Sequence, residues 1–152
     1  MNPGSSKGVI SIRALEKVDL NEVYNLICDL EEEKMDFLLF ERNLVRNTDD
    51  PNIHYFVATT GNGTIGFISL HIQHILHHNR PTGEIQELII APEYQGQGVG
   101  TMLMQKVEAI ARELNLEELE LTTKIYRERA HVFYKQLGYI NTHLKYVKKI
   151  IR

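Results

Sequence analysis

The chain of 152 residues lacks the features that mark several large classes of protein. Its single cysteine, Cys28, excludes an internal disulfide framework and a zinc site made of several cysteines. No apolar run approaches the roughly 18 residues of a membrane-spanning helix, and the N-terminus lacks the apolar segment of a signal peptide. We therefore expect a cytoplasmic protein without a membrane partner.

Basic clusters are also missing. The net charge is −3, and no run of Lys or Arg is longer than two residues, so we expect no nucleic-acid partner. The composition, 43% hydrophobic and 24% charged residues, is typical of a globular protein with one core. We expect a flexible tail at residues 1–8 and a single domain over residues 9–152.

Hydrophobic periodicity predicts an alternation of strands and helices along the domain. Strands are expected at residues 9–15, 54–60, 64–75, 85–90, 116–124 and 139–147, and helices at residues 20–30, 35–45, 99–114 and 127–137. Asp19 is the expected N-cap of the first helix, with Glu22 completing a capping box, and Gly138 is the expected C-cap of the last helix. This order predicts an α/β (α+β) fold in which helices flank one mixed sheet.

The most informative stretch is a strand, a glycine-rich turn and a helix, in that order. Residues 85–90 are apolar and rich in β-branched side chains, Pro92 ends the strand, and Gly96, Gly98 and Gly100 follow. A helix N-terminus presents unpaired N–H groups and a positive dipole end to an anion, and glycines let a phosphate approach them. The pattern predicts a phosphate-binding turn.

Two common phosphate loops do not fit this turn. The dinucleotide fingerprint needs G-x-G-x-x-G, whereas these glycines are spaced G-x-G-x-G. The Walker A loop needs Gly-Lys followed by Ser or Thr, and the chain has no such sequence. A glycine-rich connection that binds no ligand is the plain alternative.

The motif that does fit is Q-x-x-G-x-G, formed by Gln95, Gly98 and Gly100, which resembles the acetyl-CoA pyrophosphate loop of the GNAT superfamily of N-acetyltransferases. Residues 130–139, AHVFYKQLGY, resemble the superfamily helix that carries a catalytic tyrosine, here Tyr134. The resemblance implies a GNAT fold, with a central, mostly antiparallel twisted sheet of 6–7 strands and about four helices. It also implies that acetyl-CoA is the cosubstrate, held by Leu88, Ile89, Ile90, Gln95, Gly96, Gln97, Gly98, Val99, Gly100, Thr101, Arg127 and Ala130.

Within the superfamily, the chain resembles the aminoalkylphosphonate N-acetyltransferases. The matching segments are residues 23–30, 50–52, 70–73, 76–78, 83–88 and 121–123, together with Arg127, Ala130 and His131. Arg127 stands where many other members have Asn, in agreement with this subgroup. The Gln-Gly-Gln-Gly turn at residues 95–98 is closer to the general superfamily pattern. The cosubstrate therefore rests on both patterns, and the phosphonate rests on the subgroup alone.

Acetyl transfer needs a proton acceptor for the amine and a proton donor for the leaving thiolate. The resemblance makes Tyr134 the expected donor, although core packing beside Phe133 fits its helical position equally well. Glu84 and Glu87 are the candidate bases, with Glu84 preferred. On a regular strand they face opposite sides, and a bulge at the strand centre would alter that. For either one, a solvated carboxylate at the end of a strand is the alternative.

Histidines are frequent, and five of the seven lie between residues 54 and 78. His71, His74, His77 and His78 suggest a divalent metal site or donors to a phosphonate, with plain surface or packing roles as the larger alternative. Residues 71 and 74 point to opposite faces of a strand, so no metal ligands are assigned. Other cations available to an anion are Arg42, Arg80, Lys124 and Arg127.

We therefore expect an N-acetyltransferase that uses acetyl-CoA and a small-molecule primary amine, with an aminoalkylphosphonate as the best single substrate. The alternatives are another small amine, such as a polyamine or amino sugar, and a non-catalytic acetyl-CoA-binding module. Cys28 adjoins the apolar stripe of the first helix, which favours a buried cysteine over an acyl-accepting nucleophile. A homodimer is expected only by analogy with similar folds.

Overall fold

The computed structural model describes residues 8–151, so the expected tail, apart from Gly8, lies outside the described residues. The chain divides into two compact units, residues 1–120 and 121–152. The single domain over residues 9–152 stays a prediction. Among the described residues, no helix is long and apolar enough to cross a membrane.

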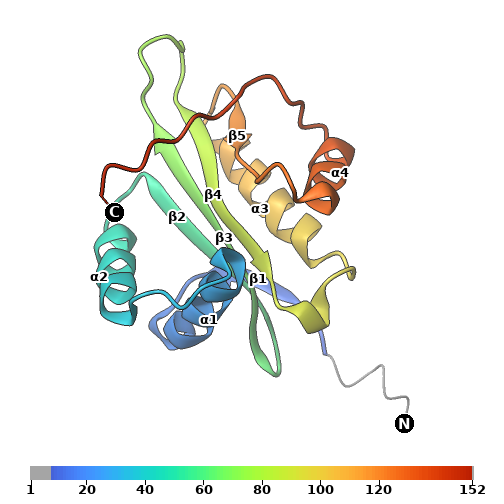
Figure 1. The fold of residues 1–152 in the computed structure, drawn as a ribbon. Helices are drawn as coiled ribbons and strands as arrows, with labels where there is room; N and C mark the ends of the chain where they lie inside the picture. Colours follow the sequence, from blue (N-terminus) through green and yellow to red (C-terminus); the bar gives the residue numbers. More distant parts are fainter. Residues whose placement is uncertain (1–7, 152) are drawn as a thin grey trace. The chain divides into compact units, whose positions relative to one another are not determined.

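The first unit is built on a sheet whose strands lie side by side in chain order (Figure 1). The strands are β1 Ser11–Ala14, β2 Ile53–Thr60, β3 Gly63–Gln73, β4 Thr82–Ile90 and β5 Leu119–Leu121, whose last residue belongs to the second unit. Strands β1 to β4 pair antiparallel, and the expected hairpin is the β2–β3 pair. The described residues form a mixed five-stranded sheet, so the expected number of six or seven strands was wrong.

Helices cover both faces of this sheet because the strand residues alternate between them. The helices of the first unit are α1 Leu20–Glu31, α2 Phe37–Thr48 and α3 Val99–Glu113. On one face, Val23 of α1 packs in a core cluster with Val57 and Phe67, which are register partners. On the other face, a Cβ at Gly66 would meet Leu103 of α3 at 3.2 Å. The core thus has two layers, one under α1 and one under α3.

Asp19 does not cap α1 with its side chain, which corrects the expected capping box with Glu22. Asp19 ends a 3₁₀ turn, Lys17–Asp19, and its buried carboxylate accepts hydrogen bonds from Arg13 and from the Thr64 hydroxyl. Glu22 instead accepts a hydrogen bond from the Thr64 N–H at 2.8 Å. Tertiary partners on β1 and β3 have displaced the local cap, and they fix the start of α1 on the sheet.

The second unit contains the helix α4, Glu128–Gln136, close to the expected range. Gly138 has a φ of +94° and its N–H bonds the Lys135 carbonyl, as expected of a residue that terminates a helix. Residues 139–147 form no strand, contrary to prediction. Alternating side chains specify a strand only when a neighbour supplies hydrogen bonds, and the described residues of this unit contain no other strand beyond the end of β5.

Candidate active site

The glycine turn between β4 and α3 has the backbone that a phosphate-binding turn needs. Gly96 and Gly98 have φ values of +77° and +82°, a region that side chains rarely occupy. A Cβ on either one would meet nothing within 4 Å, so packing does not require these glycines. Gly98 is the N-cap of α3 and supplies no side-chain cap to the N–H groups of the first turn. Open space and unpaired donors therefore fit the pyrophosphate of acetyl-CoA.

The two glutamines of the turn hold its backbone. Gln95 donates from Nε2 to the Ile90 carbonyl at 3.2 Å, and Gln97 donates from Nε2 to the Glu93 carbonyl at 3.1 Å. Both were expected among the cosubstrate-binding residues. Their side-chain donors are used inside the turn, which leaves the backbone N–H groups as the groups that face a ligand.

The centre of β4 contains a β-bulge opposite Ser69 of β3. Ile68 pairs with Leu88 and Leu70 pairs with Ile85, so Ser69 faces two residues of β4, Gln86 and Glu87. An extra residue in one strand reverses the alternation of side chains beyond it. The strand is therefore not regular, and this bulge decides which face each candidate base occupies.

Because of this bulge, Glu84 and Glu87 share one face of β4. Glu84 pairs with His71, and Glu87 hydrogen-bonds the side chain of Ser69. Residues 69 and 71 are two apart on β3 and so point to the same side of the sheet. Tyr55, the register partner of Ser69, packs with the core cluster under α1, which identifies this face.

Glu87 is held more tightly than Glu84. The Ser69 hydroxyl donates to Glu87 Oε1 at 2.8 Å and accepts from the Glu87 N–H at 3.0 Å. Burial raises the pKa of Glu87, while the Ser69 hydrogen bond and the charge of His71 oppose the shift. A carboxyl whose pKa is raised towards neutrality is suited to proton transfer from an amine.

Glu84 lies among other carboxylates. It accepts a hydrogen bond from Gln86 Nε2 at 2.8 Å. Burial and then the charges of Glu84 and Glu118 raise the pKa of Glu120 on β5. The concentration of negative charge at this end of β4 and β5 attracts a cation such as a substrate ammonium.

The outer edge of β4 offers backbone donors. The Ala91 N–H bonds the Ile65 carbonyl of β3, so alternation turns the N–H groups of Leu88 and Ile90 away from β3. The Gln95 hydrogen bond to the Ile90 carbonyl agrees with this direction. Strand β5 has three residues against nine in β4, and the Gly83 N–H bonds the Glu118 carbonyl at its start. Within the first unit, the second half of β4 therefore extends beyond β5.

Tyr134 lies on α4 of the second unit. Its ring contacts those of Phe133 and Tyr139, with centroids 5.2 and 6.2 Å away. Burial raises the pKa of the phenol, and the charge of Arg127 opposes this shift. The phenol therefore stays protonated at neutral pH, as a proton donor must.

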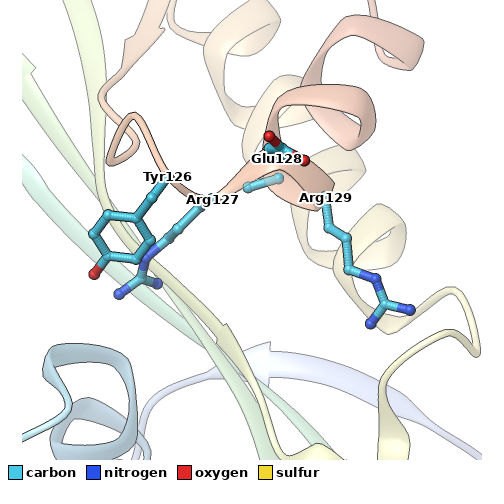
Figure 2. Close-up of a pocket in the computed structure, with 5 residues that line it drawn as sticks. Tyr126, Arg127, Glu128 and Arg129 are labelled. Atoms are coloured by element: carbon cyan, nitrogen blue, oxygen red, sulfur yellow. The ribbon is translucent and has the colours of Figure 1, made fainter.

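Arg127 and Ala130, expected at the cosubstrate, line an open hollow of about 440 Å³ at the start of α4 with Tyr126, Glu128 and Arg129. Figure 2 shows the Arg127 guanidinium beside the Tyr126 ring, 5.9 Å from its centroid, and Arg129 pointing away from both. Arg127 thus presents a positive charge beside the N-terminus of α4 in this unit.

The histidines do not gather into one site. Among the described residues, no group of three or more His, Cys, Asp or Glu side chains is arranged to hold a metal ion. His78 contacts the carboxylates of Glu117 and Glu118, which occupy both of its ring nitrogens. His71 stands on the face shared by Glu84 and Glu87. Cys28 is half-buried, and its sulfur accepts a hydrogen bond from the Met35 N–H at 3.5 Å.

Sequence reasoning missed Ser69, Tyr55 and Glu120. Ser69 had one signal, since it is a polar residue inside the apolar strand residues 65–70 and is fully buried. Tyr55, whose hydroxyl accepts a hydrogen bond from Asn47 Nδ2 at 2.8 Å, gave no signal apart from the hairpin pattern.

Comparisons with known proteins identify the family and several relatives of this chain. The sequence profile described as the Acetyltransferase (GNAT) family matches residues 18–139. The chain is 39% identical over 142 residues to the aminoalkylphosphonate N-acetyltransferase of Salmonella typhimurium, covering 93% of this chain and 92% of that one. It is 26% identical to the aminoglycoside N(6')-acetyltransferase type 1 of Stenotrophomonas maltophilia, covering 65% and 67% of the two chains.

A solved structure matches the fold at low sequence identity. The crystal structure described as a transcriptional regulator from Bacillus halodurans C-125 superposes with a TM-score of 0.87. The match covers 93% of this chain and 100% of that one at 22% identity, which shows a shared fold and nothing about substrates.

Proposed function

Because this chain belongs to the GNAT acetyltransferase family, we propose that it acetylates the primary amine of an aminoalkylphosphonate with acetyl-CoA. The observation that carries the substrate is the 39% identity, over almost the whole of both chains, to an aminoalkylphosphonate N-acetyltransferase. N-acetyl transfer follows from the family, and the choice of a phosphonate substrate is what we propose beyond it.

The glycine turn supplies the anion site for the cosubstrate. Acetyl-CoA brings an acetyl thioester, whose carbonyl carbon is open to attack by an amine. The N–H groups of Gly96, Gly98 and the first turn of α3 would hold its pyrophosphate. A Cβ on either glycine would meet nothing within 4 Å, and the N-cap of α3 makes no side-chain cap. The outward N–H groups of Leu88 and Ile90 would serve as fixed donors to the thioester oxygen.

The carboxylates on the face of the sheet under α1 would attract and deprotonate the substrate amine. A primary ammonium must lose a proton before it can attack, and Glu87, whose pKa burial raises, is the base that we propose. Glu84, on the same face, would attract the ammonium together with Glu120. This assignment departs from the expected preference for Glu84, and the reason is the hydrogen-bonded, buried environment of Glu87.

The proposed proton donor is a tyrosine. Tyr134 is the phenol that the family motif provides, and its raised pKa keeps the proton available until a thiolate leaves. The role of Tyr134 is a proposal that rests on the motif and on this protonation state.

One observation favours a second candidate, a substrate that carries several positive charges. Glu84, Glu118 and Glu120 lie close enough for their charges to interact, and an acidic surface of this kind suits a cationic amine. The 26% identity to an aminoglycoside acetyltransferase points the same way. His71, the register partner of Glu84, offers an imidazole donor that instead fits a zwitterion with an amine and an anion.

Release of free CoA thiol with matched amines tests the proposal. The panel pairs 2-aminoethylphosphonate with β-alanine and aminomethylphosphonate with glycine, and adds spermidine and an aminoglycoside. We expect kcat/KM for each phosphonate to exceed that of its carboxylate analogue by about 100-fold or more, because a site built for a dianion loses hydrogen bonds with a carboxylate. Equal values would exclude the phosphonate, and turnover of the cationic amines alone would establish the second candidate.

Two further arms of the same assay address the remaining alternatives. Pre-treatment with a chelator lowers the rate only if a divalent ion takes part. An acetyl-CoA-binding protein that releases no thiol with any amine would be a non-catalytic module. Binding is measured separately by calorimetry, so loss of chemistry is distinguished from loss of the cosubstrate.

A further inference from the structure

We propose that Ser69 is the positioning residue of the catalytic carboxylate, holding Glu87 at the β4 bulge on the face that Glu84 occupies. The inference rests on the proposed function, since it concerns the base of that reaction. It adds a residue on a neighbouring strand that need not touch the substrate.

The Ser69 hydroxyl makes two hydrogen bonds to Glu87. Its hydroxyl accepts from the Glu87 N–H at 3.0 Å and donates to Glu87 Oε1 at 2.8 Å, so one oxygen fixes both the backbone and the carboxylate of the same residue. In a regular antiparallel ladder, a β4 N–H directed at β3 would find a backbone carbonyl. Here a side chain has taken that place, because the bulge puts two residues opposite one.

Burial of Ser69 keeps water from replacing these two hydrogen bonds. Ser69 has 0% of its surface exposed, so water cannot replace its hydroxyl without a rearrangement of the strand pair. A buried carboxylate without its donor would be desolvated and free to change rotamer. Ser69 therefore sets the direction of the Glu87 carboxylate as well as its charge state.

Charged and titratable groups from neighbouring elements also act on Glu87. They are His71 on β3, Glu31 on α1, Tyr55 on β2 and, sharing its face, Glu84 on β4. His71 favours the ionised carboxylate and Glu31 disfavours it. These groups stay in place when Ser69 alone is changed, so the effect of the hydroxyl is separable from theirs.

The sign of the expected effect follows from the hydrogen bond. The Ser69 O–H stabilises ionised Glu87 and so holds its pKa below the value that burial alone would give. Loss of the hydroxyl therefore raises the pKa further. The base is then protonated up to a higher pH, and the rise of kcat/KM with pH shifts to higher pH.

The experiment compares Ser69→Ala with the wild type in two readouts. The Glu87 carboxyl carbon is titrated by NMR in protein labelled with ¹³C at glutamate, and its signal is assigned with Glu87→Gln. The pH dependence of kcat/KM is measured for the best amine substrate. In Ser69→Ala we expect both pKa values to rise by about one unit, a shift typical of a lost charge-assisted hydrogen bond, with KM for acetyl-CoA unchanged.

Controls separate positioning from folding. Ser11→Ala makes the same change at an exposed position of β1 and should alter neither readout. Ser69→Cys keeps a similar volume with a weaker donor and should shift both readouts in the same direction as Ser69→Ala. Ser69→Thr keeps the hydroxyl and should show the wild-type pH dependence of kcat/KM. In a Glu87→Gln background, Ser69→Ala should cause no further change in the pH dependence of kcat/KM.

The outcomes are distinct. An unchanged Glu87 titration in Ser69→Ala and Ser69→Cys would overturn the inference. A raised titration with an unmoved kinetic limb would show that Glu87 is not the base and would overturn it as well. If no amine is acetylated, the proposed function fails, and the NMR titration alone still decides whether Ser69 controls Glu87.

Discussion

The guanidinium of Arg13 donates hydrogen bonds of 2.7 and 2.9 Å to the two carboxylate oxygens of Asp19, whose side chain is 2% exposed. Burial disfavours ionisation of Asp19, but the bonds from Arg13, Thr64 and the Glu16 N–H outweigh it and leave its pKa below the usual value. One buried charge thus joins β1, the start of α1 and β3.

Asp19→Asn should destabilise the protein by about 2–4 kcal/mol, because it removes the buried negative charge that Arg13 and the Thr64 hydroxyl bind. The folded-state pKa of Asp19 is lowered, so its contribution to stability is complete above the unfolded-state pKa and is lost as the pH falls through the folded-state pKa. Urea unfolding at neutral and acidic pH measures this. The control Asp29→Asn, on the exposed side of α1, should stay within about 0.5 kcal/mol of the wild type.

Gly98→Val should weaken acetyl-CoA binding at least about 100-fold, because φ at this position is +82° and a side chain would occupy the space that faces the ligand. The open space predicts that the side chain itself clashes with no protein atom. Isothermal calorimetry gives the affinity, and circular dichroism checks the fold. Gly61→Ala, in a turn with nothing within 4 Å and no strained φ, is the matched control. Unchanged affinity in Gly98→Val would refute the anion site.

The glycine turn and the β2–β3 hairpin could be predicted from the sequence because their determinants are local. Gly96 and Gly98 provide positive φ values, and Gly63 does so in the hairpin. The same holds for Gly138 after α4. Where the nearest neighbours along the chain decide the conformation, sequence reasoning is sufficient.

The points that sequence reasoning predicted wrongly or left open depend on distant partners. The sequence predicts that Asp19 caps a helix, but in the structure Arg13 and Thr64 bind its carboxylate instead. The sequence left the faces of Glu84 and Glu87 open, because Ser69, on another strand, accommodates a bulge whose position no spacing rule gives. A bulge at the strand centre is compatible with the sequence, but only the register of β3 and β4 locates it.

Tyr134→Phe should lower kcat by about 100-fold or more and leave acetyl-CoA affinity unchanged, because the hydroxyl is needed only when the thiolate leaves. Steady-state kinetics with saturating cosubstrate measures kcat, and calorimetry measures binding. Tyr146→Phe, at an exposed tyrosine of the same unit, is the control and should behave as the wild type. A loss of less than about threefold in Tyr134→Phe would exclude the phenol as the acid.

Glu87→Gln and Glu84→Gln should differ in their pH profiles. A base with a raised pKa is protonated, and inactive, below that pKa, so kcat/KM should rise with pH through it in the wild type. Glu87→Gln should abolish this rise and lower the plateau by about 100-fold or more. Glu84→Gln should keep the rise and mainly increase KM for the amine. The reverse pattern would make Glu84 the base.

His71→Asn tests the anionic end of the substrate. His71 is the register partner of Glu84, packs 6.4 Å from the Tyr55 ring, and interacts with the Glu87 charge, so its imidazole lies among the groups assigned to the amine. If it binds the phosphonate, the variant should lower kcat/KM for 2-aminoethylphosphonate by about 10- to 100-fold, the range of one or two charge-assisted hydrogen bonds. An alkylamine without an anion should lose less than about threefold, because it never made that contact. Both values come from the thiol-release assay at one pH. An equal loss for both amines would mean that His71 acts on the carboxylates, and the anion would then have to be bound elsewhere.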